Sequence, residues 1–190
     1  MAHKLGCMDN SVMKVAIIGA GPRGLWASEE LMEQARERGA AIDVTVFDAK
    51  PLEESSAPGA FRDSVPEEFI LNAPKSIVET KLGPLDPDDE LPGAFPSRKH
   101  VGEHLDKSWR ALEDNLPPRC SLTHRVENIE TVEPTDSGVD VLGEHFDEVL
   151  MVTGHAHDWP GSLAHADLGD LKVVAPAYPA SNLDAVSPVS

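Results

Sequence analysis

Three glycines near the start of the chain have the spacing that lets a main chain approach a pair of phosphates. They form the segment Gly19-Ala20-Gly21-Pro22-Arg23-Gly24, a G-x-G-x-x-G pattern. The first glycine permits a sharp turn, the second leaves room for a pyrophosphate, and the third lets a helix pack closely on a strand. The N–H groups and positive dipole end of that helix attract phosphates. The pattern predicts a dinucleotide site at Gly19, Gly21, Pro22, Arg23 and Gly24.

An acidic residue follows the glycines at a distance that suits contact with a ribose. Asp48 comes after Gly24 at close to the spacing of roughly 20 residues expected for an acid that binds ribose hydroxyls. A carboxylate there disfavours a 2′-phosphate, so NADP at this site is not expected. The glycine pattern alone is weak evidence, and a glycine turn that holds no ligand is the alternative. A preceding strand, a following helix and the acid after a second strand make the pattern specific.

The elements around the glycines have the order of a strand–helix–strand unit. Residues 14–18 form an unbroken apolar run, typical of a parallel strand covered on both faces. A helix is predicted over 22–38, with Pro22 in its first turn and Gly39 as its stop. We expect the helix to face the sheet along one line of side chains. A second strand is predicted over 41–47. The residues of that helix face are Gly24, Ala27, Leu31 and Ala35.

A long segment then separates this unit from the next helix. Residues 50–96 are rich in Pro, Gly, Asp and Glu, with a single apolar island at 69–72. Loops of this length are usually functional or disordered. The acidic part, 86–90, is equally well explained as a solvated surface insertion. We therefore predict an excursion from the sheet with no regular structure assigned to it.

The second half of the chain is predicted to return to the sheet. Ser97 is positioned to cap a helix whose apolar residues recur every three or four positions. Short strands are predicted over 121–123, 126–132 and 139–142, a buried strand over 146–152, and a further short strand near 171–174. The expected fold is α/β, a Rossmann-like FAD/NAD(P)-binding domain with a parallel sheet and a small antiparallel β-meander. The helix face comprises Val101, Leu105, Trp109, Leu112 and Leu116.

A zinc site is a competing interpretation of the second helix. His100, Glu103 and His104 fit the H-x-x-E-H pattern, with both histidines on one helical face. Zinc requires a third protein ligand and a water position, and none is evident. Gly102 also weakens the helix at this point. We predict no metal site here.

Two further patterns carry little chemistry. His155, His157 and Asp158 cluster after the last strong strand, and a polar turn explains them better than a metal site. A short-chain dehydrogenase needs Tyr-x-x-x-Lys, but Tyr178 is the only tyrosine and Asn182 stands four residues later. That class is excluded, and no residue is assigned as a catalytic acid, base or nucleophile.

The composition limits the partners. Asp and Glu number 33 against 16 Lys and Arg, giving a formal charge of −17, which argues against nucleic acid and anionic membranes. Cys7 and Cys120 lie far apart, so reduced thiols and a cytoplasmic location are expected. No stretch reads as a membrane span or signal peptide. Residues 1–13 are predicted to be a disordered or tag-like N-terminal extension.

Six short segments occur in a characteristic order along the chain: 15–25, 70–73, 95–98, 102–105, 149–155 and 177–179. Together they resemble the bacterial FAD/NAD(P)-binding family related to lysine and ornithine N-hydroxylases. The long excursion before the third element also favours FAD over NAD, because a simple NAD domain would continue with further strand–helix units. The resemblance covers residues 14 to about 186, and we assign the domain to 14–175 with a tail over 176–190.

The resemblance implies a role for each matching residue. The glycines would surround the FAD pyrophosphate, Asp48 would bind the adenosine ribose, and Val126 would lie against the adenine through its backbone. Thr153 and Gly154 would turn the chain close to the pyrophosphate or flavin, while Asn72 and Arg98 would approach the isoalloxazine.

The resemblance also implies a larger protein. Relatives continue into a second dinucleotide-binding half, and this chain ends near the point where that half begins. We therefore expect the FAD-binding portion of a flavin-dependent oxidoreductase of the NAD(P)H-dependent monooxygenase type, completed by a second chain or a C-terminal half. The alternatives are a non-catalytic nucleotide-binding or assembly module and a fragment of an NAD-only dehydrogenase.

Overall fold

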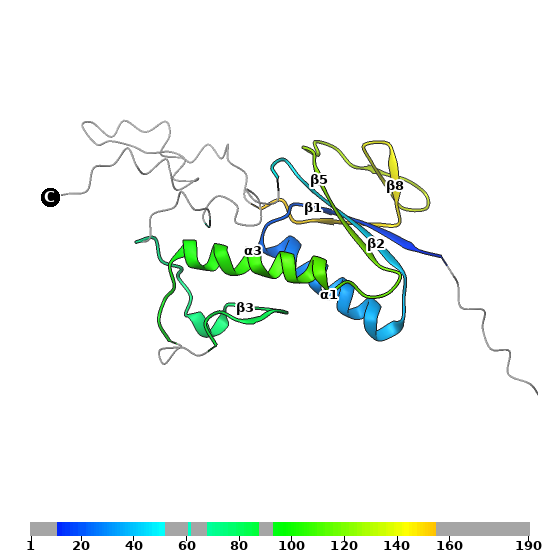
Figure 1. Cartoon of the computed structure of the whole chain (residues 1–190). Coiled ribbons are helices and arrows are strands. Elements are labelled where there is room, and N and C mark those ends of the chain that lie inside the picture. Colours follow the sequence, from blue (N-terminus) through cyan, green and yellow to red (C-terminus); the bar gives the residue numbers. More distant parts are fainter. Residues whose placement is uncertain (1–10, 52–60, 62–67, 88–92, 155–190) are drawn as a thin grey trace, which may run out of the picture.

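A four-stranded parallel sheet forms the centre of the molecule in a computed structural model that describes residues 11–51, 61, 68–87 and 93–154. The strand order is β5-β2-β1-β9 (Figure 1). All three neighbouring pairs are parallel, and Ile18 of β1 pairs with Phe47 of β2 and Met151 of β9. The strands are β1 (Met13–Ile18), β2 (Ile42–Asp48), β5 (Ser121–Val126) and β9 (Glu148–Met151).

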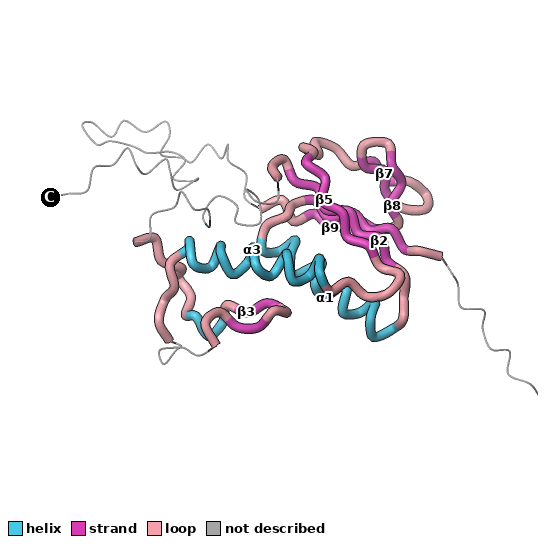
Figure 2. The backbone as a smooth tube through the Cα atoms, viewed as in Figure 1, coloured by secondary structure: helices cyan, strands magenta, loops and turns pink. Residues whose placement is uncertain are grey.

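Two helices cover one face of this sheet. They are α1 (Pro22–Arg38) and α3 (Arg98–Asp114), which lie on the same side of the sheet (Figure 2). Val15 and Ile17 of β1 point into the apolar cluster beneath these helices. Ala16 and Ile18 point into a second cluster on the other face. Because both faces of β1 are buried over residues 15–18, these residues form an unbroken apolar run rather than an alternating one.

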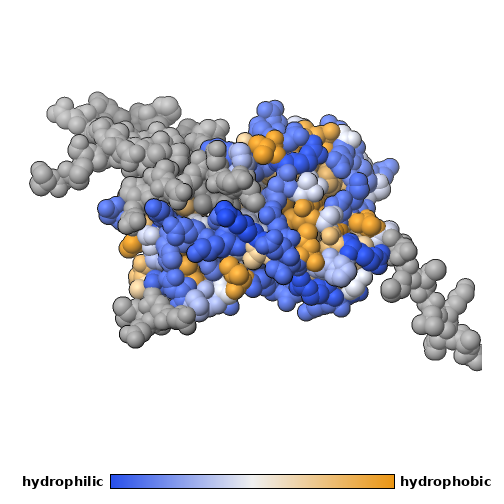
Figure 3. Space-filling view, in the orientation of Figure 1, coloured by the Kyte–Doolittle hydropathy of each residue, from blue (hydrophilic) through white to orange (hydrophobic). Residues whose placement is uncertain are grey.

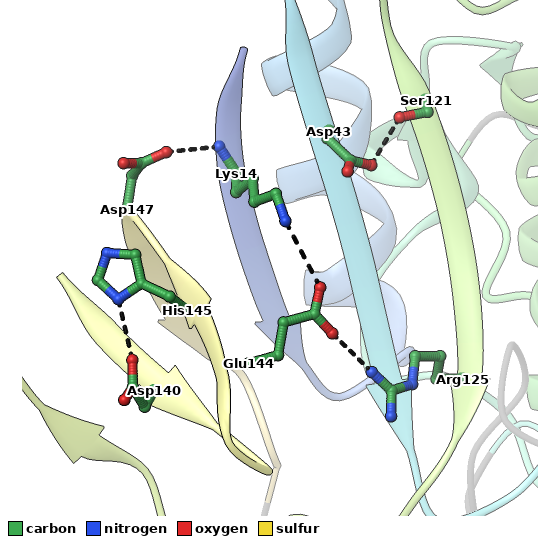
Figure 4. Close-up of polar contacts among 8 residues, drawn as sticks. All are labelled: Lys14, Asp43, Ser121, Arg125, Asp140, Glu144, His145 and Asp147. Atoms are coloured by element: carbon green, nitrogen blue, oxygen red, sulfur yellow. Dashed lines mark hydrogen bonds and ion pairs between the residues drawn. The ribbon is translucent and has the colours of Figure 1, made fainter. Parts of the chain in front are cut away.

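A small antiparallel sheet covers the second face. It consists of β6 (Glu133–Pro134), β7 (Val139–Val141) and β8 (Glu144–Phe146). Phe146 packs edge to face on Phe47, with ring centroids 5.9 Å apart. Polar contacts join the two sheets as well, because Glu144 pairs with Lys14 at 3.7 Å and with Arg125 at 3.0 Å (Figure 4). The β-meander predicted from the sequence is therefore confirmed.

The described part of the excursion is more ordered than we expected. It contains a 3-10 turn, η2 (Lys75–Ile77), and a short hairpin of β3 (Glu79–Thr80) and β4 (Gly83–Pro84). Thr80 Oγ1 lies 2.7 Å from Ser108 Oγ on α3. The carboxylate of Asp86 contacts His100 Nε2 at 2.8 Å and Lys75 Nζ at 3.0 Å. These polar contacts hold the hairpin on α3, a long-range arrangement that no local pattern indicated.

The structure confirms the predicted starts of both helices and the end of α1, but the predicted buried face of α1 was partly wrong. The structure confirms α1 over Pro22–Arg38, ended by Gly39 in the left-handed region at φ 62°. Ser97 caps α3, as predicted, by accepting a hydrogen bond from His100 N–H at 3.2 Å. The face of α1 that is buried differs from the predicted one, because Ala27 and Leu31 are only partly buried and the residues next to them in sequence, Ser28 and Met32, are buried instead. The buried residues of α1 are Gly24, Leu25, Ser28, Glu29, Met32 and Ala35.

Two strand predictions were wrong at their boundaries. One strand, β5, runs from Ser121 to Val126 where two were expected, and residues 127–132 form no strand. The polar residues in its middle are tolerated because Arg125 lies over the Phe47 ring at 4.9 Å and pairs with Glu144.

The expected buried strand over 146–152 divides at Asp147 into β8 and β9, which belong to different sheets. The Asp147 carboxylate accepts a hydrogen bond from Lys14 N–H at 2.7 Å, which fixes the chain where it changes sheet. β9 is an edge strand of the described sheet, so Met151 is 55% exposed. The predicted strand at 171–174, the cluster at His155, His157 and Asp158, and the proposed tail lie outside the described residues.

The face of the molecule drawn in Figure 3 is mainly hydrophilic, with several groups of hydrophobic side chains between the polar ones. Among the described helices, none is both long and apolar enough to cross a membrane.

Candidate functional site

The carboxyl ends of the four parallel strands meet at one edge of the sheet. Successive strands proceed from β1 to β2 and β5 on one side, whereas β9 lies on the other side of β1. The direction of winding therefore reverses at β1. In open α/β sheets, ligands bind in the crevice at such a reversal, outside the carboxyl ends of the strands. The glycine turn leaves β1 at this point.

The three positions of the turn favour glycine for different structural reasons. Gly19 has φ +115°, and a Cβ on it would lie 2.6 Å from Val152 O. A Cβ on Gly24 would overlap Gly19 O, so this glycine permits the close approach of α1 to the turn. Gly21 has φ −68° and ψ −172°, an extended conformation open to any residue. The backbone itself does not require glycine at position 21, which fits a need for space beside a ligand.

The start of α1 offers main-chain donors. Its first intrahelical hydrogen bond runs from Leu25 N–H to Gly21 O at 3.0 Å, so the N–H groups of Arg23 and Gly24 precede the helical ladder. Pro22 occupies the first helical turn and has no N–H to leave unpaired. Among the described residues, no side chain caps this helix at Gly21. The exposed Arg23 adds positive charge to a helix end that already favours anions.

Asp48 faces the glycine turn. Its Oδ2 accepts a hydrogen bond from Ala20 N–H at 2.9 Å, and its Oδ1 accepts one from Lys50 N–H at 3.1 Å. Val126 pairs with Asp48 in the sheet and is 58% exposed. The Asp48 carbonyl also accepts a hydrogen bond from Glu127 N–H at 2.8 Å. The carboxylate, the turn and the end of β5 therefore lie together.

Thr153 and Gly154 lie on the other side of the turn. Val152 N–H donates to Ile18 O at 2.9 Å, which extends the pairing of β9 with β1 past the end of the strands. Thr153 Cα is 3.3 Å from the position that a Cβ on Gly19 would occupy. Gly154 has φ +82°, a conformation in the left-handed region that favours glycine. Thr153 therefore lies directly beside the glycine turn, and Gly154 follows it in the chain.

Asn72 and Arg98 form a second group, away from the turn. The segment before Asn72 pairs with the start of α3 through Leu71 N–H to Pro96 O at 2.8 Å and Arg98 N–H to Phe69 O at 2.7 Å. The guanidinium of Arg98 lies 5.7 Å from the centroid of the Phe61 ring. Arg98 is separated from Trp109, which touches the glycine turn, by 11 helical residues, or about 16 Å along the axis. The two groups therefore lie at different points along α3.

The sequence analysis missed a residue that contacts the glycine turn, Trp109 of α3. We assigned it to the apolar face of α3, and it is fully buried there. Its indole N–H also donates to Ala20 O at 3.2 Å. The general signal was available, since a buried tryptophan N–H usually finds an acceptor, but nothing local identified which one.

The histidines of the zinc pattern have separate partners. His100 Nε2 contacts Asp86, whereas His104 Nε2 lies 3.3 Å from Thr80 Oγ1. Burial lowers the pKa of His104, which favours its neutral form in this polar cluster. Within the described ranges, no group of three or more His, Cys, Asp or Glu side chains could hold a metal ion.

Comparison with known proteins agrees with this geometry. A family model described as FAD-NAD(P)-binding matches residues 16–156, from β1 through the end of the described sheet. The chain belongs to the FAD-NAD(P)-binding family. This assignment confirms the Rossmann-like fold and the dinucleotide cofactor predicted from the sequence, and it includes FAD among the cofactors of the family.

One curated relative of this FAD-NAD(P)-binding protein extends the comparison. The chain is similar to the flavin-containing monooxygenase FMO GS-OX3 of Arabidopsis thaliana, with 27% identity over 183 residues. The match includes 80% of this chain but only 39% of the relative. The chain thus spans well under half the length of that monooxygenase.

Proposed function

We propose that this chain is the FAD-binding portion of a flavin-dependent oxidoreductase of the monooxygenase type, with NAD(P)H as co-substrate. One observation carries the proposal: the Asp48 carboxylate, the glycine turn and Thr153–Gly154 converge at the edge where the winding of the sheet reverses. Membership of the FAD-NAD(P)-binding family and similarity to a flavin-containing monooxygenase support it.

The ADP half of FAD would occupy the glycine turn. The N–H groups at the start of α1 would bind the pyrophosphate, and Asp48 would accept hydrogen bonds from the adenosine ribose. The exposed end of β5 at Val126 would lie against the adenine. Thr153 and Gly154 would border the pyrophosphate on the side of β9.

The flavin half would extend from the turn along α3. Asn72 and Arg98 are the chain's candidates for contact with the isoalloxazine, because they lie together near the start of that helix. The flavin supplies the redox chemistry when bound, and the protein orients it and shields it from water. We assign no catalytic acid or base to this chain. The substrate site and the NAD(P)H site would belong to a C-terminal half or a second chain. The complete protein would act in the cytoplasm.

Ligand titration of the purified chain tests this proposal. FAD should bind near one equivalent, ADP should compete with it, and FMN should not bind, because FMN lacks the adenosine and one phosphate. Flavin fluorescence and calorimetry both measure these affinities. A chain that binds neither FAD nor ADP would favour the non-catalytic module and overturn the proposal. Binding of NADH and ADP without FAD would favour the NAD-only dehydrogenase instead.

A further inference from the structure

Ala20, in the middle of the glycine turn, is held at both of its main-chain polar groups. Its N–H donates to Asp48 Oδ2 at 2.9 Å, and its carbonyl accepts from Trp109 Nε1 at 3.2 Å. Ala20 is 1% exposed and Trp109 is fully buried, so the contact between them is shielded from water, whereas Asp48 is only partly buried. The residue before it is also fixed, because Gly19 N–H donates to Phe47 O at 2.7 Å. The turn is thus restrained from β2 and from α3.

The contact from Trp109 determines where the next N–H points. In a trans peptide, the carbonyl of one residue and the N–H of the next point in opposite directions. Trp109 holds the Ala20 carbonyl toward the buried core, so the Gly21 N–H points away from it. Gly21 is itself partly exposed, and no described residue accepts a hydrogen bond from its N–H. This N–H is therefore available on the outer side of the turn.

The indole is a rigid donor. Its ring packs edge to face on His124 of β5, with centroids 4.8 Å apart and an interplanar angle of 80°. Trp109 also lies in the apolar cluster between the helices and the sheet. Figure 1 shows α3 running beside the start of α1, which brings the indole to the turn. A fixed donor keeps the turn in one conformation before any ligand arrives, and such preorganisation favours binding.

We propose that Trp109 is a positioning residue for the pyrophosphate: its N–H orients the Ala20–Gly21 peptide so that Gly21 N–H is presented to a phosphate oxygen. This inference rests on the proposed function, because it deepens the account of the same site. A purely structural tryptophan would contribute to folding alone. A positioning tryptophan contributes to affinity even in a fully folded chain.

An isosteric replacement separates these two roles. Trp109 is replaced in the full chain by 3-benzothienylalanine, which keeps the ring size and substitutes sulfur for the N–H. Trp109→Phe serves as a second, genetically simpler variant. We expect the Kd for FAD and for ADP to rise about three- to tenfold at a temperature where every variant is folded. In ¹⁵N spectra of the ligand-free chain, the Gly21 amide resonance should shift.

Two controls match the replacement. Val141→Ala removes fully buried volume from the cluster on the opposite face of the sheet and should lower the Tm without changing either Kd. Trp26→Phe alters a tryptophan of α1 that is 47% exposed. A benzothienyl variant with a lower Tm but wild-type Kd values and an unmoved Gly21 amide would overturn the inference. If the wild-type chain binds no ligand, the proposed function fails, and the Gly21 amide alone decides whether Trp109 orients the peptide.

Discussion

The two long helices begin in opposite ways. Both have 17 residues, but α3 is capped by Ser97, whose side chain accepts the His100 N–H at 3.2 Å. The start of α3 is further enclosed by Asp86, which contacts His100 and Lys75. The start of α1 has Gly21 at the capping position, with no side-chain cap among the described residues. The N–H groups of Arg98 and His100 at the start of α3 therefore have acceptors in the chain, whereas no side-chain cap occupies the N–H groups at the start of α1.

This difference separates stability from binding. A Ser cap stabilises a helix by about 1 kcal/mol relative to Ala, whereas glycine supplies no side-chain acceptor. The open end of α1 is adjacent to the Asp48 carboxylate and the end of β9, whereas the capped end of α3 is surrounded by its own chain. The contrast between the two helix starts predicts that changes at the start of α1 affect ADP affinity more than folding. Changes at the cap of α3 should affect folding more than ADP affinity.

The largest effect is expected from closing the open helix. Gly21→Asp provides a good capping side chain in a backbone conformation that any residue adopts, so the Tm should stay constant or rise. The new carboxylate would repel the pyrophosphate, and the Kd for FAD should increase at least about 100-fold. Calorimetric titration and thermal denaturation measure the two quantities on the same sample. Retained affinity would show that no phosphate approaches Gly21.

The next effect tests the carboxylate beside the open helix, using a matched pair on one strand. Asp48 and Asp43 lie at opposite ends of β2, and Asp43 contacts Ser121 Oγ at 2.6 Å rather than the turn. Asp48→Asn weakens charge-assisted hydrogen bonds to the ribose, so the Kd for ADP should rise about 10- to 100-fold. Asp43→Asn should leave that Kd unchanged. An equal loss of ADP affinity in both variants would show that the position of Asp48 at the carboxyl end of β2 has no special role in binding.

The open helix was predictable from the sequence because its signals are local. Glycine spacing, Pro22 and the stop at Gly39 set the bounds of α1, and Ser97 identified the start of α3. The distance from Gly24 to Asp48 was informative because one helix and one strand fill it. These signals rest on backbone preferences that act within a few residues.

The remaining features depend on contacts between distant residues. Trp109 and Ala20 are 89 positions apart, and Lys14 and Asp147 are 133 apart. The second contact divides an apparently continuous strand between two sheets, which no local preference encodes. The hairpin that holds Asp86 near His100 likewise depends on packing against α3. Such contacts follow from tertiary packing, which overrides local propensity.

A smaller effect, on stability alone, should follow from opening the capped helix. Ser97→Ala removes the acceptor for His100 N–H and should cost about 1 kcal/mol, a decrease in Tm of roughly 3 °C. The affinity for ADP should not change, because the cap is far along α3 from the glycine turn. Thermal denaturation and ADP titration provide the test. A loss of ADP affinity would contradict the division between the two helix starts.

The smallest effect concerns the charges beside the capped helix and depends on pH. The Lys75 ammonium and then His100 hold the pKa of Asp86 below its ordinary value of 3.8. A lowered folded-state pKa means that the carboxylate stabilises the fold above pH 3.8 and loses this contribution as the pH falls through the folded-state pKa. Asp86→Asn is a suitable variant because asparagine tolerates the φ of +50° found at this position.

The Asp86→Asn variant should have a Tm about 2 °C below wild type at pH 6. The decrease is small because the ion pairs of Asp86 with Lys75 and His100 are partly exposed, and such pairs contribute little to stability. The difference should shrink as the pH falls below 3.8 toward the folded-state pKa, where the folded wild type loses the same charge. A difference that stays constant down to pH 2.5 would attribute the effect to packing rather than to ionisation. Because the Asp86 carboxylate lies beside the start of α3, far along the helix from the glycine turn, the ADP affinity of the variant at pH 7 should equal that of wild type. Weaker ADP binding would instead show that the two helix starts are coupled through the hairpin.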